Sequence, residues 1–294
     1  MSNIFRYNFN KIYVCHGRSY ADFIPFMYKP FVDNIRKLLE PVNYKTDYSN
    51  IITYDLLQPN EVLIFMGDVD KPDPSVLFTL LQKGIYIIYY NTEPIKYLFP
   101  YNEIWTYSKY LFTIYNKINE NQLILYVPIM LDTNVPYVPY HIKDEKKSLT
   151  FMGSFNYRAK TRDILFQSDF LKENIEEVYN LWNEYDYNRF ISTKPKIYLN
   201  VMKLGGTEIN ILPSARINKL LSHKCIIISE YCNEIDDELY RNIIYFCKLE
   251  EIEDVYRMLL SKSNEELQKE ANKKYELFCE RFCEENVKKN ILCK

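Results

Sequence analysis

The sequence predicts an α/β protein with two Rossmann-like open parallel-sheet domains that face each other across a cleft. Short apolar runs alternate with segments of helical period in both halves of the chain. The length of 294 residues suits two domains of ordinary size. Residues 136–147, rich in Pro, Tyr and charge, are expected to form the linker between domains at 1–135 and 148–294.

The first domain is expected to alternate strands with helices. Runs rich in β-branched and aromatic residues predict strands, and apolar residues three or four apart predict helices. The expected strands are 11–17, 61–67, 85–91, 103–106 and 123–128, and the expected helices are 25–40, 74–83 and 109–116. Because the strands are continuously apolar, we expect a parallel sheet covered by helices on both faces.

The second domain repeats this pattern. The expected strands are 148–153, 196–202, 225–229 and 243–247, and the expected helices are 160–167, 214–222, 250–260 and 264–290. The last helix carries apolar residues towards a core and is a candidate for crossing back to the first domain.

Composition excludes several classes of protein. The net charge of -2 lacks the basic excess of a nucleic-acid-binding protein, so we expect no nucleic-acid partner. Residues 1–10 do not form a signal peptide, and no apolar run is long enough to span a membrane. Seven cysteines without metal-type pairs indicate reduced thiols. These features predict a cytoplasmic protein without a transmembrane segment.

Glycines mark the ends of the predicted strands. Five of the six glycines lie at or just after a strand: Gly17, Gly67, Gly153, Gly205 and Gly206. In open α/β sheets this carboxyl edge binds ligands, because the chain turns there into helix N-termini. The alternative is that glycine only eases tight turns between strands and helices.

Polar residues gather at the same edges. Gly153 is followed by Ser154, Arg158 and Lys160, and Lys203 precedes the second glycine turn. Cations beside glycine turns suit a diphosphate, to which Arg offers a bidentate fork and Lys a point charge. The P-loop and G-x-G-x-x-G patterns are absent from the sequence.

Three segments carry a resemblance to a known family. They are FMGSFNYR at 151–158, KIYLNV at 196–201, and ARINKLLSHKCIIISE at 215–230. The second half resembles the C-terminal domain of the GT-B glycosyltransferases, of the small two-domain type that uses nucleotide sugars. In the first half, 89–94 and 103–108 look like strand ends of small members of this group.

The resemblance implies that the second domain binds the nucleotide-sugar donor and the first the acceptor, a glycan or other glycoconjugate. The implied donor-binding residues are Gly153, Ser154, Arg158, Lys160, Lys203, Thr207, Glu208, Ile209, Asn210, Arg216 and Lys219. The diphosphate is expected near Arg158 and Arg216, and the base and ribose near 207–210. On the acceptor side the residues are Gly17, Arg18, Asn91 and Ser108.

The implied chemistry needs neither a cofactor nor a metal, since cations and helix N-termini stabilise the departing diphosphate. An inverting enzyme needs a general base, and His16, Asp68 and Glu93 are candidates by position. Each of the three is equally explained as a turn or cap residue.

The sequence departs from the family pattern at one point. Many retaining members place two glutamates eight residues apart, but here Glu208 is followed by Asn218 and Lys219 where the second acid would fall. His223 and Lys224 replace the usual glycine of the next loop. Retention or inversion at the anomeric carbon therefore stays open.

Two other functions stay open. One is a non-catalytic two-lobe module that closes on a small ligand, and the other is a sugar-nucleotide epimerase of the same architecture. Release of sugar and nucleoside diphosphate, interconversion of sugars, or binding without either would distinguish the three functions. The oligomeric state stays open too.

Overall fold

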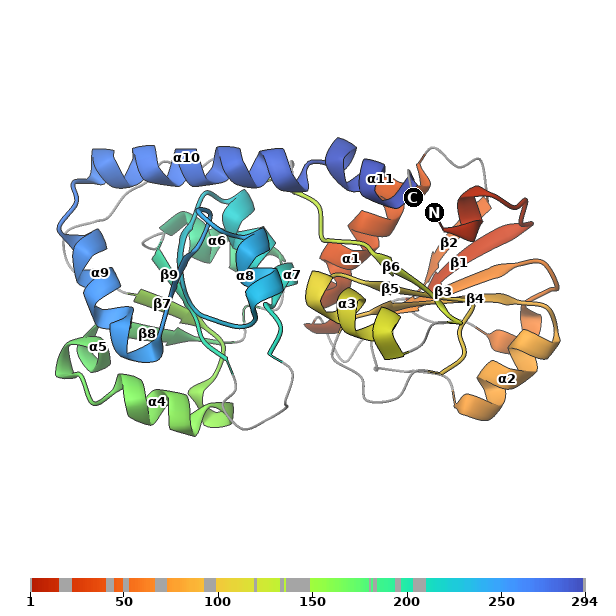
Figure 1. Cartoon of the computed structure of the whole chain (residues 1–294), viewed down its shortest axis with the longest axis horizontal. Helices are drawn as coiled ribbons and strands as arrows, with labels where there is room; N and C mark the ends of the chain where they lie inside the picture. The colour runs from red at the N-terminus through yellow and green to blue at the C-terminus, as the bar shows by residue number, and fades with distance from the viewer. Residues whose placement is uncertain are drawn as a thin grey trace. The chain divides into compact units, whose positions relative to one another are not determined.

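The computed structural model describes residues 2–15, 23–40, 45–49, 53–66, 73–92, 99–118, 121–132, 135, 149–179, 181, 184–193, 197–202 and 210–292. The chain divides into two compact units. Unit 1 comprises Met1–Met130 with Phe282–Lys294, and unit 2 comprises Leu131–Arg281. Each unit contains one parallel sheet flanked by helices (Figure 1). The predicted linker at 136–147 lies outside the described residues.

Unit 1 contains a six-stranded sheet with the order β2-β1-β3-β4-β5-β6. All of its described strand pairs are parallel. The strands are β1 (Lys11–Cys15), β2 (Lys45–Ser49), β3 (Val62–Met66), β4 (Tyr86–Asn91), β5 (Glu103–Thr106) and β6 (Leu123–Tyr126). Every residue of β3 is buried and apolar, as expected for a strand covered on both faces.

The helical elements of unit 1 follow the predicted alternation. They are η1 (Asn3–Phe5), α1 (Phe23–Leu39), η2 (Tyr54–Leu56), α2 (Pro74–Gln82), α3 (Lys109–Ile118) and α11 (Glu284–Leu292). Asp73 caps α2 by accepting a hydrogen bond from the Ser75 N–H at 2.8 Å. Gly84 follows α2 with φ of +85°, a left-handed conformation that glycine adopts without strain.

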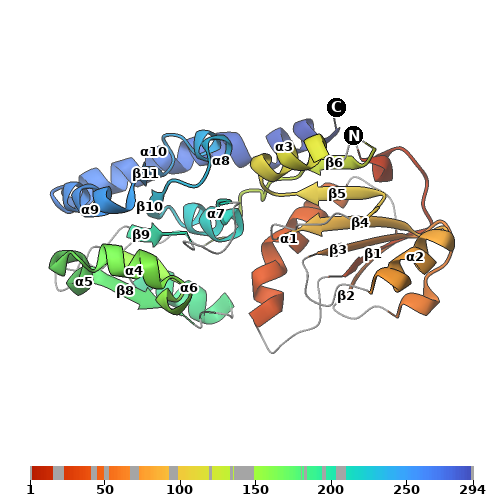
Figure 2. The ribbon, with the colours of Figure 1, turned by 60° about the horizontal axis from the view of Figure 1, so that its bottom comes forward.

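Unit 2 contains a five-stranded parallel sheet with the order β11-β10-β9-β7-β8. The strands are β7 (Leu149–Met152), β8 (Ile175–Val178), β9 (Ile197–Asn200), β10 (Ile226–Glu230) and β11 (Tyr245–Cys247). Its helical elements are η3 (Phe155–Tyr157), α4 (Ala159–Leu165), α5 (Asp169–Asn174), α6 (Glu184–Thr193), α7 (Ser214–Ser222), α8 (Glu234–Leu239), η4 (Leu249–Glu251), α9 (Ile252–Leu260) and α10 (Asn264–Phe282). Figure 2 shows these helices around the sheet.

One face of the unit 2 sheet packs into a continuous apolar core. Strand residues Phe151, Leu199 and Ile228 meet helix residues there. The helix residues come from α4, α5, α9 and α10, and include Leu165, Leu171, Leu259 and Leu267. Burial of this face fixes the register of the strands, because a one-residue shift would turn their side chains to the other face.

Both sheets have the same strand order around the point where the winding reverses. The second strand of each unit, β2 or β8, lies at the sheet edge beside the first, and the third lies on the other side of the first. This reversal defines a topological switch point between β1 and β3, and another between β7 and β9. Ligands of doubly wound sheets bind beyond the carboxyl ends of the strands at such points.

A buried carboxylate lies at the opposite, amino edge of the unit 1 sheet. Glu103 begins β5 and is fully buried. Its Oε2 accepts hydrogen bonds from Ser2 Oγ (2.7 Å) and Trp105 Nε1 (2.9 Å). Its Oε1 accepts from the Asn3 N–H (2.6 Å) and the Tyr86 hydroxyl (2.9 Å). Burial, together with the charge of Glu103, raises the pKa of Tyr86.

The structure corrects three expectations about secondary structure. The segment 264–290 forms two helices, α10 and α11, separated by Cys283. The expected helix at 250–260 begins as the short helix η4 before α9. The edge strands β2 and β8 were not predicted, because their sequences, KTDYS and IEEV, lack a continuous apolar run. α11 packs against β6 of unit 1.

Candidate functional site

The switch point of unit 2 lies where β7 and β9 end, and Gly153 forms the turn after β7. The Gly153 N–H donates to the carbonyl oxygen of Val178, at the end of β8, at 2.9 Å. A Cβ atom on Gly153 would lie 2.9 Å from Cζ of the buried Phe151 ring, closer than carbon atoms pack in proteins. Glycine therefore permits the backbone to pass this ring.

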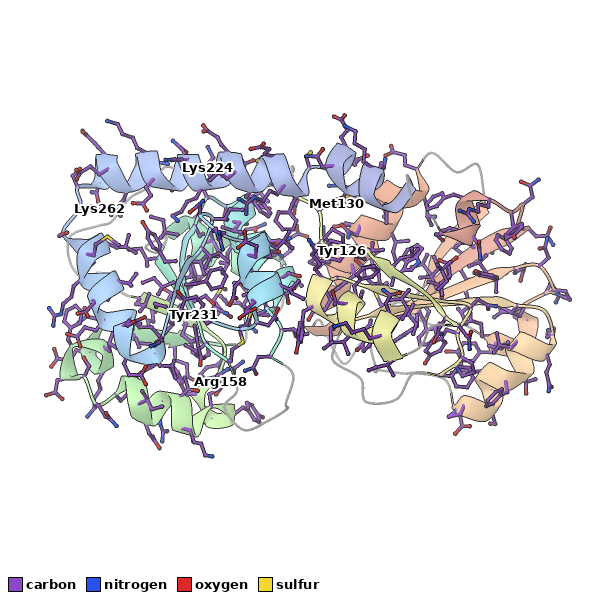
Figure 3. The ribbon with its side chains drawn as sticks, viewed as in Figure 1. Tyr126, Met130, Arg158, Lys224, Tyr231 and Lys262 are labelled. Atoms are coloured by element: carbon purple, nitrogen blue, oxygen red, sulfur yellow. The ribbon has the colours of Figure 1, made fainter. Side chains whose placement is uncertain are left out.

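Arg158 joins the two strand ends at this switch point. Its Nε donates to the carbonyl oxygen of Val201 beyond β9 at 3.2 Å, and its Nη1 donates to that of Ser154 beyond β7 at 3.1 Å. The guanidinium carbon lies 5.3 Å from the centre of the Phe151 ring. Burial lowers the pKa of Arg158, and the charge of Glu177 opposes this shift. Figure 3 labels Arg158 in unit 2.

Two of the five N–H groups of the Arg158 guanidinium bind these backbone carbonyls. The other three have no acceptor among the described residues, so Arg158 is a fixed, partly desolvated cation at the carboxyl edge of the sheet. Partial burial strengthens its attraction to an anion, because less water screens the charge. This geometry suits a phosphate group.

Glu230 approaches the same peptide group from the side of β10. Its Oε2 accepts a hydrogen bond from the Met202 N–H at 2.8 Å, while Arg158 binds the Val201 carbonyl of that peptide group. Burial raises the pKa of Glu230, the Met202 hydrogen bond opposes this shift, and the charge of Glu250 adds to it. A cation and a carboxyl group thus lie on either side of the peptide group that follows β9.

Asn200 is a buried amide at the end of β9. Its Nδ2 donates to Ser229 Oγ at 2.9 Å. Its Oδ1 has no hydrogen-bond partner among the described residues, although Asn200 is 2% exposed. A buried polar atom of this kind normally binds a water molecule or a ligand.

Helix α7 carries two more of the predicted cations of unit 2, Arg216 and Lys219. Arg216 lies in its first turn and is partly buried, and the helix has no side-chain cap at Pro213. The Lys219 ammonium lies 4.2 Å from the centre of the Tyr187 ring, on α6. An uncapped helix start with an arginine in its first turn favours a bound anion.

Asn218 stands where the resemblance would place a second acid. Its buried Oδ1 accepts a hydrogen bond from the Tyr240 hydroxyl at 2.6 Å. The amide therefore fixes α7 against the residue that follows α8. This hydrogen bond stabilises the packing of α7 and is not a ligand contact.

The remaining described donor residues lie around the same edge. Ser154 caps η3, accepting from the Asn156 N–H at 3.2 Å. Lys160 is exposed on α4. The Asn210 carbonyl accepts from Asn233 Nδ2 at 2.8 Å. Lys203, Thr207, Glu208 and Ile209 lie outside the described residues.

The described acceptor-side residues of unit 1 contact helix α3. Asn91 is fully buried and its Nδ2 donates to the Tyr115 hydroxyl at 2.9 Å. Ser108 Oγ accepts from the Leu111 N–H at 3.2 Å, which caps the start of α3. The other predicted residues of unit 1 lie outside the described residues: His16, Gly17, Arg18, Asp68 and Glu93.

The sequence analysis did not assign Asn200 or Glu230 to the site. Both lie at the carboxyl ends of predicted strands, but an amide or carboxylate at that place is also common in structural turns. What marks Asn200 and Glu230 is their position beside the switch point. That position becomes known only when the order of the strands in the sheet is known.

No group of three or more His, Cys, Asp or Glu side chains suited to a metal ion occurs among the described residues. None of the described helices is both long and apolar enough to cross a membrane.

Several solved structures resemble the chain over most of its length. T4 phage β-glucosyltransferase matches with a TM-score of 0.57 and 12% identity, covering 95% of this chain and 97% of that chain. The lipopolysaccharide outer core galactosyltransferase WaaB matches with a TM-score of 0.54 and 11% identity, covering 95% and 97%. An α1,3-fucosyltransferase with GDP matches with a TM-score of 0.51 and 11% identity, covering 97% and 88%.

Neither a protein-family model nor a curated protein sequence matches this chain. At such low identities the structural likeness shows the fold alone. The fold is that of the GT-B glycosyltransferases, with two doubly wound α/β units in one chain. The predicted fold class of two Rossmann-like open parallel-sheet domains is therefore confirmed.

Proposed function

We propose that the protein is a glycosyltransferase that moves a sugar from a nucleotide-diphosphate sugar to a hydroxyl of a glycan or glycoconjugate. The observation that carries this proposal is Arg158, a partly buried cation fixed across the unit 2 switch point. The similar solved structures include a glucosyltransferase, a galactosyltransferase and a fucosyltransferase with GDP, which supports sugar transfer as the reaction class.

The donor diphosphate is proposed to bind unit 2 between Arg158 and the first turn of α7. Arg158 supplies N–H donors beside the ends of β7 and β9, and Arg216 adds a second positive charge. Both charges would stabilise the nucleoside diphosphate as the bond to the sugar breaks. We propose that transfer requires no metal ion, so activity should persist in EDTA.

The proposed general base, if the reaction inverts configuration, is one of His16, Asp68 and Glu93. His16 and Asp68 belong to the segments that follow β1 and β3 in the sequence, the two strands that flank the switch point of unit 1. The anomeric configuration of the product, read by NMR, will decide between inversion and retention. Loss of turnover with unchanged donor binding in one variant will identify the base.

The donor site is tested with Arg158→Met and its matched control Arg162→Met. Arg162 lies on the exposed surface of α4 and pairs with Asp163 at 3.1 Å, so its loss should leave nucleotide binding unchanged. Because Arg158→Met removes the cation at the switch point, we expect the Kd for UDP, GDP or dTDP to rise about 10- to 100-fold, as for one charged hydrogen bond. Calorimetric titration of the full chain measures this change.

Three results would contradict parts of this proposal. Unchanged nucleotide affinity in Arg158→Met would remove the donor site from this switch point. Interconversion of nucleotide sugars without transfer would identify an epimerase. Tight binding with neither transfer nor hydrolysis of any nucleotide sugar would identify a binding module.

A further inference from the structure

Helix α7 ends in a strained turn at Lys224. The Lys224 N–H donates to the Leu221 carbonyl oxygen at 2.9 Å. The Cys225 N–H donates to that of Leu220 at 3.1 Å, and the two bonds together form a Schellman cap. Lys224 has a φ of +57°, a left-handed conformation that glycine adopts freely and that costs free energy for a residue with a Cβ atom. The turn therefore keeps a lysine where the backbone favours glycine.

Lysine is an unusual residue at such a position. Among the described residues, the other non-glycine residues with positive φ are Asn60 and Asn242. Asparagine tolerates this conformation because its short polar side chain can hydrogen-bond locally. The long side chain of lysine offers no such local bond. We therefore expect the side chain of Lys224 to offset the strain through contacts with another element.

The side chain of Lys224 makes two contacts with α10. Its Nζ donates to Asn272 Oδ1 at 3.1 Å and lies 4.9 Å from the centre of the Tyr275 ring. The same Asn272 oxygen accepts from Gln268 Nε2 at 3.3 Å, one turn earlier in α10. The end of α7 is therefore tied to the middle of α10.

The contact with α10 adds a directional constraint on α7. α10 is a fixed support, because its residues Leu267 and Ala271 are buried in the apolar core of unit 2. Apolar packing is non-directional, whereas a hydrogen bond fixes a distance and an angle. Asn218 makes such a bond from the middle of α7, and Lys224 makes one from its end. Two directional contacts at different points set both the position and the tilt of the helix.

The position of α7 decides where Arg216 lies. Arg216 is in the first turn of this helix of nine residues, which is about 13 Å long. Because a short helix moves as a rigid body, a shift or tilt at its end reaches its first turn. Charged hydrogen bonds from a guanidinium to a phosphate need a matched distance and angle. The contact of Lys224 with α10 therefore bears on the charge at the other end of α7.

We propose that Lys224 is a positioning residue, which binds Asn272 of α10 and so holds α7 where Arg216 meets the donor diphosphate. The role rests on the proposed function, in which Arg216 binds the diphosphate. Lys224 acts through α7 and needs no contact with the ligand itself.

The first test is Lys224→Met, which keeps the apolar stem and removes the ammonium. We expect the Kd for UDP, GDP or dTDP, measured by calorimetric titration of the full chain, to rise about 3- to 10-fold, less than for loss of a charged hydrogen bond to the ligand. Asn272→Ala removes the same hydrogen bond from the side of α10 and should weaken binding equally. Lys224→Arg keeps a cation that donates to Asn272 and should restore binding.

A double-mutant cycle shows whether Lys224 acts through Arg216. Arg216→Met alone should raise the nucleotide Kd about 10- to 100-fold, as for one charged hydrogen bond. Adding Lys224→Met to this variant should cause no further loss, because the group that Lys224 positions is already gone. A merely structural role would weaken binding by the same factor in both backgrounds.

Lys224→Gly separates affinity from stability. It removes the contact with α10 and the strain of the turn together. We expect it to unfold at a higher urea concentration than Lys224→Met and yet to bind nucleotides as weakly. Recovery of wild-type affinity in Lys224→Gly would show that the strain of the turn, and not the contact with α10, governs binding.

Lys262→Met is the matched control. Lys262 also binds α10, with its Nζ 2.5 Å from Glu270 Oε2, but it lies in the connection between α9 and α10 and makes this contact away from α7. Its loss should leave the nucleotide Kd unchanged. Figure 3 labels both Lys224 and Lys262.

Two outcomes would overturn the positioning role alone: wild-type nucleotide affinity in Lys224→Met, or equal losses with and without Arg216. Arg216→Met distinguishes these from failure of the proposed function. If Arg216→Met binds nucleotides like wild type, the assignment of α7 to the donor site is itself wrong, and the role of Lys224 falls with it.

Discussion

The two sheets share a strand order, but among the described residues the Glu103 cluster of unit 1 and the Arg158 contacts of unit 2 lie at opposite edges. In unit 1 the Glu103 cluster lies at the amino edge, where β4 and β5 begin. In unit 2 the contacts of Arg158 and Glu230 lie at the carboxyl edge, where β7, β9 and β10 end. Since ligands of open α/β sheets bind at the carboxyl edge, the first set lies away from the proposed donor site and the second lies at it.

The largest effect on stability is expected from Glu103→Ala. This change leaves two buried and two partly buried donors without their acceptor, so we expect the free energy of unfolding of unit 1 to fall by about 3–5 kcal/mol. Urea unfolding followed by Trp105 fluorescence measures the loss. Glu173→Ala, at an exposed site on α5, should change stability by less than about 0.5 kcal/mol.

The same variant tests the division between the two edges. While unit 1 stays folded, Glu103→Ala should bind nucleoside diphosphates as wild type does. A parallel loss of affinity under conditions where Trp105 fluorescence remains native would show that the amino edge of unit 1 also controls the ligand site.

A smaller effect is expected from Gly153→Ala, and Gly84→Ala provides its counterpart in unit 1. The new Cβ at residue 153 would press on the buried Phe151 ring, which packs against Phe155 with centroids 4.4 Å apart. We expect a loss of about 1–3 kcal/mol and weaker nucleotide binding, because Arg158 rests over the same ring. Thermal unfolding and calorimetric titration measure the two effects.

Gly84→Ala should cost about 1 kcal/mol, because alanine is strained at a φ of +85°. The space around that residue is open, with its nearest neighbour atom, Pro59 Cβ, at 3.9 Å. Nucleotide affinity should stay at the wild-type value. A drop in affinity with this variant, or none with Gly153→Ala, would contradict the assigned difference between the two glycines.

A gain of stability, in place of a loss, is expected at Lys274, a buried charge of unit 2 away from the carboxyl edge. Burial lowers its pKa to about 8, an effect that the charge of Glu270 opposes and those of Lys262 and Lys273 reinforce. Its ammonium lies 3.9 Å from the centre of the Tyr245 ring. Lys274→Met removes the cost of burying the charge, and we expect a gain of about 1–2 kcal/mol at pH 7.

The lowered pKa of Lys274 also predicts how the free energy of unfolding changes with pH. Between pH 8 and the ordinary lysine pKa of 10.5, the unfolded chain binds a proton at Lys274 that the folded chain does not. Stability therefore rises with pH across this window in the wild type, relative to Lys274→Met. Chemical denaturation at several pH values measures the difference, and the exposed Lys269→Met is the control. Parallel stability curves for wild type and Lys274→Met would contradict the assignment.

The sequence predicted the apolar strands well, including the edge strands β6 and β11, but missed the charged edge strands β2 and β8. The run at 61–67 contains β3, whose continuous apolar residues need burial on both faces, and 103–106 forms β5 with the predicted bounds. The strands β2 and β8 contain Lys45, Asp47, Glu176 and Glu177. Charged edge strands resist pairing with other chains, but they carry no hydrophobic signal.

This difference explains why the candidate site was predicted only in part. Gly153 and Arg158 could be placed near a strand end from their spacing, but the switch point is defined by where β8 lies. Asn200 and Glu230 can be assigned to the site only because β10 lies next to β9. Which strands pair depends on contacts between residues that are distant in the sequence. A local sequence pattern therefore cannot predict it.

The Glu103 cluster also has a consequence for synthesis of the chain. Ser2 and Asn3 find their acceptor about a hundred residues later. At a translation rate of about 5–20 residues per second, roughly 5 to 20 seconds pass between synthesis of the first partner and the last. During that interval the strands β1 to β4 lack their anchor to the chain start, so a nascent chain halted before residue 103 should remain sensitive to protease at its N-terminus.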